Sequence, residues 1–239
     1  MNVAILLAGG VGNRLGAGIP KQYVEVCGKP LIVHSLEMYQ RSKFVDAVEV
    51  VCAPEYEDKI WYWAKQYGID KLKWIAYGGV SCQESTRNGI FNLEDKCSAE
   101  DVLTVNMSTS VFVDDDILAD SFAICAKYGC AFSAMQCIYN NAETFDGISS
   151  VKIHYKESHK MLNMPWTAPL GTLSTLYHEA TEKNIDMEQS SYMPTLFLKM
   201  GKPLYFSKDN ALNQLHVVRP EELKIVTACL KMQIEEGIR

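Results

Sequence analysis

Two kinds of segment alternate along the chain. Short, mostly apolar runs, such as residues 3–7 and 102–105, are typical of strands that are buried on both faces of a parallel sheet. Longer segments with apolar residues at helical spacing, such as 30–39 and 116–128, predict amphipathic helices. Strands and helices in alternation indicate βαβ units, in which helices cover both faces of a parallel sheet.

The remaining elements continue this pattern, with one interruption. Between residues 131 and 165 the alternation changes, and 149–155 alternates polar and apolar residues as a half-exposed strand or hairpin does. We therefore expect a single α/β domain over 1–239, with a Rossmann-like three-layer fold, a mostly parallel central sheet and a protruding β-arm over about 136–162. Further strands are expected over 45–52, 74–77 and around 204–206, and further helices over 55–67, 85–93, 170–183 and 220–234.

Composition and charge limit the classes of partner. The 239 residues are 48% hydrophobic and 22% charged, which is typical of a globular protein and excludes a mostly disordered chain. The formal net charge of −6 argues against a nucleic-acid or anionic-membrane surface, because both need a basic face. No apolar stretch is long enough to span a membrane. We therefore predict no nucleic-acid and no membrane partner, while a local cationic pocket for a small anion remains open.

The cysteines and histidines carry no metal or disulfide pattern. The eight cysteines are scattered singly, which is typical of small core residues rather than of a disulfide scaffold. The first ten residues lack the basic segment of a signal peptide, so we expect a cytoplasmic protein. The five histidines form no HExxH motif, and no nucleophile elbow occurs. A zinc enzyme or a serine hydrolase is therefore disfavoured.

A glycine-rich loop follows the first predicted strand. Glycines allow close backbone approach to a ligand, so that several N–H groups can point at phosphate oxygens. Arg14 can bind a phosphate through two hydrogen bonds, and Lys21 adds a point charge. The alternative is an ordinary strand-to-helix turn with solvated basic residues; neither GxxxxGK[ST] nor GxGxxG is present. The candidate nucleotide-binding residues here are Ala8, Gly9, Gly10, Val11, Gly12, Asn13, Arg14 and Lys21.

Three blocks in the chain resemble a known enzyme family. AGGVGNRL followed by PKQY (residues 8–23) is similar to the signature loop of nucleotidyltransferases, and most similar to the cytidylyltransferases acting on methylerythritol phosphate and ribitol phosphate. Residues 78–89 resemble the family's GGxxRQxSVxNG block, and 217–223 resemble its VTRPEDL block. The three blocks occur in the family's order and extend over nearly the whole chain.

The resemblance implies cytidylyl transfer from CTP to a small phosphorylated acceptor, with release of pyrophosphate. Arg14 and Lys21 would hold the triphosphate and act as the catalytic residues. Gly78 and Gly79 lie in the block that contacts the base, and Ser85 either contacts the base too or caps a helix. The acceptor would be a polyol phosphate such as ribitol phosphate or methylerythritol phosphate. The family pattern also implies Mg²⁺ or another divalent cation, and a homodimer formed through the arm.

The chain departs from the family at the metal and acceptor positions. The two metal-associated acids fall at Asn106 or Met107, depending on the alignment, and at Asn213. The run at 114–116 or Asp209 would be the compensating acids, although an acidic run before a helix more often caps it. The family's arginine in the second block is Cys82 here.

The predicted acceptor side has lost most of its charge. Residues 161–169 are apolar and uncharged, so Thr167 and His216 are the remaining candidates for acceptor binding. Trp166 would either stack on a ligand or fill the core. Three hypotheses follow: a working cytidylyltransferase with an altered acceptor, a CTP-binding paralogue without catalysis that acts as a regulator or partner, and a nucleotidyltransferase for another nucleotide or a sugar phosphate.

Overall fold

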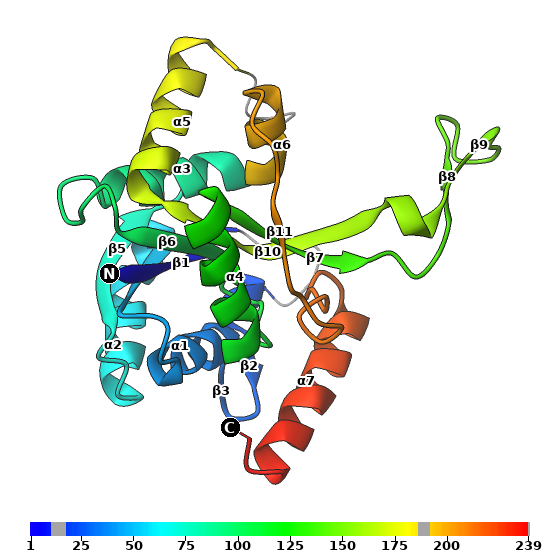
Figure 1. Cartoon of the computed structure of the whole chain (residues 1–239). Coiled ribbons are helices and arrows are strands. Elements are labelled where there is room, and N and C mark those ends of the chain that lie inside the picture. Colours follow the sequence, from blue (N-terminus) through cyan, green and yellow to red (C-terminus); the bar gives the residue numbers. More distant parts are fainter. Residues whose placement is uncertain (11–17, 186–191, 239) are drawn as a thin grey trace.

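A central sheet of seven strands forms the middle layer of the molecule (Figure 1). The computed structural model describes residues 1–10, 18–185 and 192–238. The strand order is β11–β7–β10–β6–β1–β4–β5, and β10 runs antiparallel to both neighbours while the other pairs are parallel. The predicted α/β fold with a mostly parallel sheet is confirmed. The strands are β1 (Asn2–Ala8), β4 (Ala47–Cys52), β5 (Leu72–Tyr77), β6 (Val102–Met107), β7 (Ala131–Gln136), β10 (Lys160–Pro169) and β11 (Phe206–Ser207).

Helices cover both faces of this sheet, because strands such as β1 carry apolar residues on both of their faces. In β1, Val3, Ile5 and Leu7 pack in one hydrophobic cluster, whereas Ala4 and Leu6 pack in another. The first cluster contains residues of α3 (Cys82–Asn92), α5 (Leu170–Glu182) and α6 (Met193–Lys199). The second contains residues of α1 (Leu31–Arg41), α2 (Glu57–Gln66) and α4 (Asp115–Tyr128), and a third cluster lies under α7 (Pro220–Glu235).

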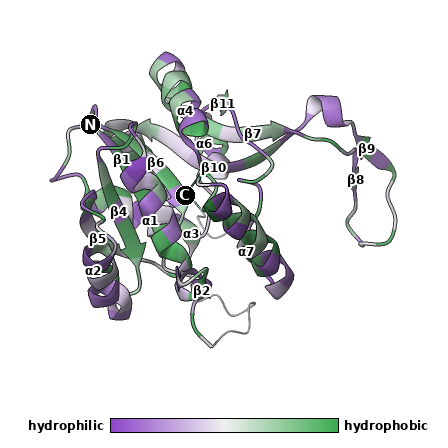
Figure 2. Cartoon of the chain, turned by 90° about the horizontal axis from the view of Figure 1, so that it is seen from below, coloured by the Kyte–Doolittle hydropathy of each residue, from purple (hydrophilic) through white to green (hydrophobic). Residues whose placement is uncertain are grey.

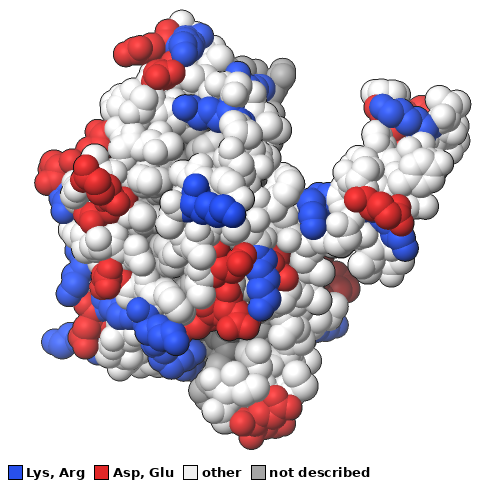
Figure 3. Space-filling view, viewed as in Figure 1, with Lys and Arg blue, Asp and Glu red and all other residues white. Residues whose placement is uncertain are grey.

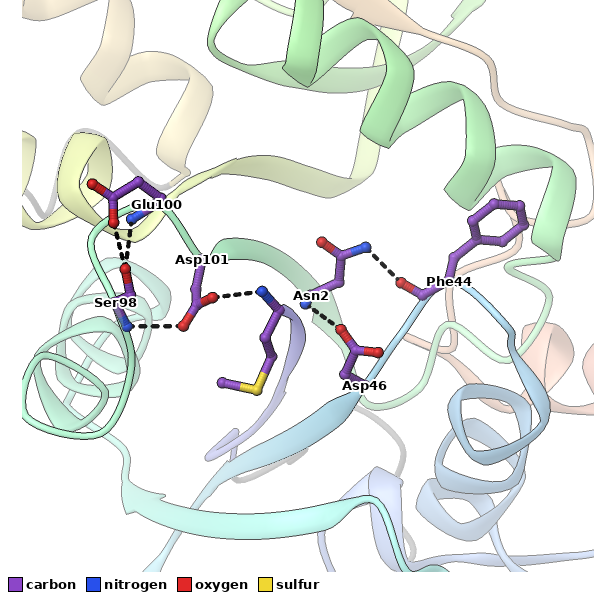
Figure 4. A network of polar contacts seen from close by, with 7 residues as sticks. Asn2, Phe44, Asp46, Ser98, Glu100 and Asp101 are labelled. Atoms are coloured by element: carbon purple, nitrogen blue, oxygen red, sulfur yellow. Dashed lines mark hydrogen bonds and ion pairs between the residues drawn. The ribbon is translucent and has the colours of Figure 1, made fainter.

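Polar contacts fix the amino end of β1 (Figure 4). The amino group of Met1 donates to Asp101 at 2.5 Å, and the backbone N–H of Asn2 donates to Asp46 at 2.7 Å. The Asn2 side chain donates to the carbonyl of Phe44 at 2.8 Å. Since β4 and β6 run parallel to β1, all three carboxyl ends lie at the opposite edge of the sheet, where ligands usually bind in open α/β folds.

A β-arm extends from the sheet, as the change in pattern predicts. Beyond β7 the chain forms a hairpin of β8 (Asn141–Glu143) and β9 (Lys152–His154), and it returns through the 3-10 turn η4 (Lys156–Ser158) into β10. Figures 1 and 2 show this arm standing clear of the layered body. Only three residues of the predicted strand 149–155 pair with a neighbour.

Several elements differ from the predicted ones for identifiable reasons. The helix predicted from residue 85 begins at Cys82, because the hydroxyl of Ser81 accepts the Glu84 N–H at 3.1 Å and caps it. β7, β10 and α6 were not predicted, since their mostly buried residues show no simple alternation. The remaining short elements are η2 (Lys21–Tyr23), β2 (Glu25–Val26), β3 (Lys29–Pro30) and η3 (Pro54–Tyr56).

Candidate functional site

The loops after β1 and β5 meet above the carboxyl end of β4. The Gly78 N–H donates to the Cys52 carbonyl at 2.9 Å, and a Cβ on Gly78 would lie 3.4 Å from the Cα of Gly9. The Ser85 hydroxyl reaches these loops: it accepts the Gly79 N–H at 3.1 Å, and a Cβ on Gly9 would lie 3.4 Å from its Oγ. We call Gly9, Gly78, Gly79 and Ser85 the glycine cluster. Residues from two of the three motif blocks are thus neighbours in space.

Gly79 is required by the first turn of α3. A Cβ on Gly79 would lie 2.3 Å from the Cβ of Glu84, which is closer than real Cβ contacts. The Glu84 carboxylate accepts the Val80 N–H at 2.8 Å and so remains above the loop. Because Ser81 is the helix cap, the alternative role of Ser85 as a cap is wrong. Ser85 instead supports the backbone of Gly79 from within the helix.

Gln22 fixes the start of the glycine-rich loop, a role that the sequence pattern did not reveal. Its buried side-chain amide donates to the carbonyls of Ala8, at 2.5 Å, and Gly10, at 2.8 Å. A buried amide needs such partners. The position of this glutamine next to the aromatic Tyr23 in the PKQY block was the signal in the sequence for its burial. Of the predicted loop residues, Val11, Gly12, Asn13 and Arg14 lie outside the described residues.

Lys21 lies at the edge of a cavity of about 420 Å³. Its ammonium donates to the Val217 carbonyl at 2.7 Å, which joins η2 to the segment before α7. A cavity of this size suits a small ligand. Its polar lining residues are Lys21, Asn163, Thr195 and His216, and its other lining residues are Met107, Leu162, Met164, Trp166, Tyr192, Pro194 and Val218.

His216 adds a titratable group to the lining of the Lys21 cavity. Among the described residues its ring forms no hydrogen bond. Partial burial, and then the positive charge of Lys21, lower the pKa of His216 below its ordinary value; Asp209 and Glu222 act in the opposite direction. The ring is therefore neutral at pH 7 and has a nitrogen that can accept a proton.

Next to the cavity, polar side chains around Asp209 form hydrogen bonds with one another. The Asp209 carboxylate accepts the side-chain amides of Asn213 at 2.7 Å and Asn163 at 3.1 Å. It also accepts the side chain of Gln214 at 2.5 Å and the backbone N–H of Asn210 at 2.9 Å. We call Asn163, Asp209, Asn213 and Gln214 the amide cluster. Each oxygen of Asp209 already has two donors.

The amide cluster does not fit a magnesium site. Mg²⁺ prefers charged, hard oxygen ligands, and the one carboxylate of the cluster is saturated by N–H donors. The Asn213 amide donates to the Met164 carbonyl at 2.7 Å as well as to Asp209, and its Oδ1 is buried with no partner in the described chain. One neutral buried oxygen does not hold this ion. Over residues 1–10, 18–185 and 192–238, no group of three or more His, Cys, Asp or Glu side chains could hold a metal.

The two alternative positions for the other family acid differ in surroundings. Asn106 is fully buried, and its amide donates to the Tyr39 hydroxyl at 3.1 Å. It therefore faces the core, and the alignment that makes Asn106 a metal position has no support in its contacts. Met107 lines the Lys21 cavity, so the position that faces a ligand carries a thioether instead of a carboxylate.

The nearby acidic run does not compensate. Asp114 caps α4 by accepting the Ile117 N–H at 2.8 Å, which is the more common role of such a run. Asp115 accepts the hydroxyl of Ser42 at 2.5 Å, and Asp116 pairs with Lys208 at 3.1 Å. None of the three acids lines the Lys21 cavity.

Thr167, predicted to bind the acceptor, is a core residue. It is 1% exposed, its hydroxyl lies 2.8 Å from that of Ser121 and 3.0 Å from that of Thr104, and it is not part of the cavity lining. In the register of β10 on β6, Thr167 lies opposite the buried Thr104. Trp166 is buried in the core, as one of its two alternatives states. It also forms a wall of the cavity, with its ring edge-on to Tyr192, and stacking on a ligand stays a prediction.

Charges of both signs are interspersed over the face shown in Figure 3. This distribution agrees with the acidic net charge of −6. In the part of the chain that the structure describes, no helix is long and apolar enough to cross a membrane.

Comparisons with known proteins agree with the sequence blocks. The family model for 2-C-methyl-D-erythritol 4-phosphate cytidylyltransferase matches residues 2–137. A ribitol-5-phosphate cytidylyltransferase of Lacticaseibacillus paracasei is 32% identical over 233 residues, which cover 97% of this chain and 98% of the relative. A 2-C-methyl-D-erythritol 4-phosphate cytidylyltransferase of Clostridium novyi is 24% identical over 237 residues, covering 96% of each chain.

Solved structures share the fold. A 4-diphosphocytidyl-2C-methyl-D-erythritol synthase from Anaerococcus prevotii superposes with a TM-score of 0.78 at 15% identity, covering 97% of this chain and 98% of that one. The Francisella tularensis 2-C-methyl-D-erythritol 4-phosphate cytidylyltransferase gives 0.78 at 18% identity, covering 95% and 98%. The family model and the full-length relative show that the chain belongs to the 2-C-methyl-D-erythritol 4-phosphate cytidylyltransferase family and is a cytidylyltransferase acting on a polyol phosphate.

Proposed function

We propose that the protein transfers the cytidylyl group of CTP to ribitol 5-phosphate and releases pyrophosphate. The similarity to the Lacticaseibacillus paracasei ribitol-5-phosphate cytidylyltransferase carries this choice of acceptor, because it extends over 97% of the chain at 32% identity. The similarity to the Clostridium novyi enzyme for methylerythritol phosphate extends as far but is 24% identical. Methylerythritol phosphate is therefore the second candidate acceptor.

In this proposal the glycine cluster binds the cytidine part of CTP and the glycine-rich loop binds the triphosphate. Gly9 and Gly10 leave room for phosphate oxygens beside the backbone, since a Cβ on Gly10 would meet no atom of the described residues within 4 Å. Ser85 and Gly79 would contact the base, because they match the family positions that do so, and their hydrogen bond defines the shape of the loop. Arg14 and Lys21 would bind the triphosphate and neutralise charge in the transition state.

The chemical step is an in-line displacement at the α-phosphorus of CTP. A phosphate oxygen of the acceptor forms the new P–O bond while the bond to the oxygen that bridges the α- and β-phosphates breaks, and pyrophosphate leaves with both electrons of that bond. No covalent enzyme intermediate is needed, so positioning and charge neutralisation supply the catalysis. Lys21 is suited to both tasks, because it lines the cavity proposed for the acceptor and directly precedes Gln22, which binds the start of the loop after β1.

The divalent cation implied by the family resemblance is not matched by the donors around the cavity. The amide cluster is internally satisfied and Met107 is a poor ligand for a hard cation, as argued above. We therefore assign no step of the reaction to a cation held by these residues.

The proposed assembly is a homodimer formed through the arm. Phe145 is 96% exposed and Ile148 92% exposed at the tip, and Tyr139 and Tyr155 are also exposed along the arm. Apolar side chains exposed in this number on one projection usually mark an interaction site. The unit would act in the cytoplasm, where its eight unpaired cysteines would stay reduced.

Incubation with CTP and ribitol 5-phosphate in a Mg²⁺-containing buffer tests the proposal. We expect stoichiometric pyrophosphate and CDP-ribitol, and a lower kcat/KM with methylerythritol phosphate. Thermal shifts should rank CTP above UTP, GTP and ATP, because a ligand that binds only the native state raises the melting temperature. Bound CTP without turnover on either acceptor would overturn the proposal in favour of a non-catalytic CTP-binding protein. A preference for another nucleotide would favour the third hypothesis.

A further inference from the structure

His216 and Lys21 line the same cavity from different parts of the chain. Lys21 belongs to η2, and His216 lies just before α7. The hydrogen bond from Lys21 to the carbonyl of Val217 holds the ammonium one residue away from His216. A ligand phosphate between the two side chains would therefore meet a permanent cation and a ring whose charge depends on pH.

The other charged groups near His216 have partners elsewhere. Asp209 is saturated by the amide cluster. Glu222 accepts the Val218 N–H at 2.7 Å and pairs with Arg219 at 2.8 Å. Among the residues that the structure describes, Lys21, Asp209 and Glu222 are the charged groups that act on His216, and Lys21 opposes protonation. Without a ligand the ring is thus kept neutral, and a dianionic phosphate would reverse that balance.

We propose that His216 binds the phosphate of the acceptor and takes up a proton from solvent as the acceptor enters the cavity. This inference rests on the proposed function, because it needs a phosphate monoester as the ligand. At pH 7.5 such a phosphate is mostly dianionic, since its second pKa is about 6. The proton therefore comes from water and goes to the imidazole. It returns to solvent when the cytidylylated product leaves, because the transferred phosphate then carries one negative charge less.

Acceptor affinity should consequently fall as pH rises. When binding takes up one proton, the association constant decreases about tenfold per pH unit until the ring of the complex itself titrates. CTP affinity should lack this dependence. A pH dependence seen for the acceptor but not for CTP would distinguish proton uptake on acceptor binding from a general effect of pH on the fold.

Isothermal titration of ribitol 5-phosphate into protein saturated with an α,β-methylene analogue of CTP measures the linkage directly. The analogue cannot release pyrophosphate, so only binding is observed. Titrations in buffers with different ionisation enthalpies at pH 7.5 should show uptake of a large part of one proton. The same titrations with methylerythritol phosphate cover the second candidate acceptor.

Three variants assign the proton to His216. We expect His216→Gln to bind the acceptor about tenfold more weakly at pH 7 and to take up no proton, and His216→Lys to bind it with little dependence on pH. His178→Gln, on the exposed face of α5, is the matched control and should behave as the wild type. All variants should bind the CTP analogue normally, which verifies their fold.

Two outcomes would overturn the inference and are distinguishable. If an acceptor binds without proton uptake, or if His216→Gln retains the uptake, the role of His216 is wrong while the proposed function stands. If the CTP analogue binds but neither acceptor does, the proposed function is wrong and the inference falls with it.

Discussion

The glycine cluster and the amide cluster are built in opposite ways. In the glycine cluster, backbone groups of Gly9, Gly78 and Gly79 come close together because they carry no side chains, and a ligand can approach the backbone. In the amide cluster, Asp209 is surrounded by donors from its own chain. One region leaves polar groups for a ligand, whereas the other uses them to hold β10 against the segment before α7.

This difference explains why family resemblance is uneven along the chain. A backbone-lined site depends on glycine at a few positions and tolerates change elsewhere, so its sequence blocks remain recognisable. A site lined by side chains changes its chemistry with each substitution. Met107, Asn213 and His216 are such changes, and they lie around or next to one cavity.

The largest effect should come from Lys21, which lines the same cavity as Asn163 of the amide cluster. Lys21→Ala should lower kcat/KM about 10³-fold, as expected for loss of a group that stabilises transition-state charge. Steady-state kinetics with both substrates varied provides the measurement. Lys65→Ala, on the exposed face of α2, is the matched control. Activity within threefold of the wild type would remove Lys21 from the catalytic site.

Asn213→Asp should break the amide cluster. The new carboxylate would face the Met164 carbonyl and the Asp209 carboxylate, each of which now accepts an N–H at 2.7 Å. A buried carboxylate at 213 would replace a donor of the half-buried Asp209 by a like charge, which should cost about 3 kcal/mol of the free energy of unfolding. Urea denaturation at pH 7.5 measures the loss, which should shrink near pH 4 as one carboxyl becomes protonated.

Asn140→Asp provides the control for that substitution. Asn140 lies exposed on the arm and accepts the Lys156 N–H through its side-chain oxygen, a bond that aspartate can also make. Its stability should stay within about 0.5 kcal/mol of the wild type. An equally mild effect of Asn213→Asp would mean that a cation or water neutralises the pair, contrary to the fit argued above.

Glu49 makes the region under the glycine cluster sensitive to pH. It is buried on β4 beneath α3, and burial raises its pKa to about 8. A group with a raised folded-state pKa stabilises the fold below its unfolded pKa, and this contribution is lost as pH rises toward 8. Stability should therefore fall by about 1.4 kcal/mol per pH unit between pH 5 and 8 from this group alone.

Glu49→Gln should remove this slope. Urea midpoints measured across pH 5–8 test it, and hydrogen exchange should show α3 as the region that becomes more protected in the variant at pH 8. A slope that is unchanged in Glu49→Gln would show that the carboxyl is already ionised in the folded protein.

The smallest effects should come from two threonine substitutions, which distinguish a core residue from a residue of the cavity lining. Thr167→Val removes a hydroxyl that contacts Thr104 and Ser121 and should cost about 1 kcal/mol of stability, with the acceptor KM unchanged. Thr195→Val, in the cavity lining, should raise the acceptor KM severalfold with little change in stability. The reverse result would return Thr167 to the acceptor site.

Sequence patterns predicted the layers well and singled out the residues that the structure brings together in the glycine cluster; nucleotide binding by that cluster stays a prediction. Strands buried on both faces and amphipathic helices leave periodic signals, and the residues of the glycine cluster lie within two continuous blocks. Ser85 was found for the same reason, although its partner is Gly79 rather than the end of the helix.

The amide cluster left no such signal. Asn163 meets Asp209 and Asn213 only because β10 enters the sheet antiparallel and runs beside the segment before α7. Pairing of this kind depends on tertiary arrangement, not on spacing. Thr167 was misassigned because the side of β10 on which it lies follows from the register of β10 on β6, which a mostly apolar, uncharged segment does not reveal.

β10 connects two places that would otherwise be independent. It extends from the arm into the sheet (Figure 1), beginning at Lys160. Its irregular stretch between Leu162 and Trp166 supplies one wall of the cavity. A strand transmits displacement along its length, so a molecule that binds the arm can also shift that wall of the cavity. If a partner bound to the arm changes the affinity of the cavity for its small ligand by some factor, that ligand must change the affinity of the arm for the partner by the same factor. Assembly through the arm and substrate binding in the cavity would then be coupled through the ten residues of β10.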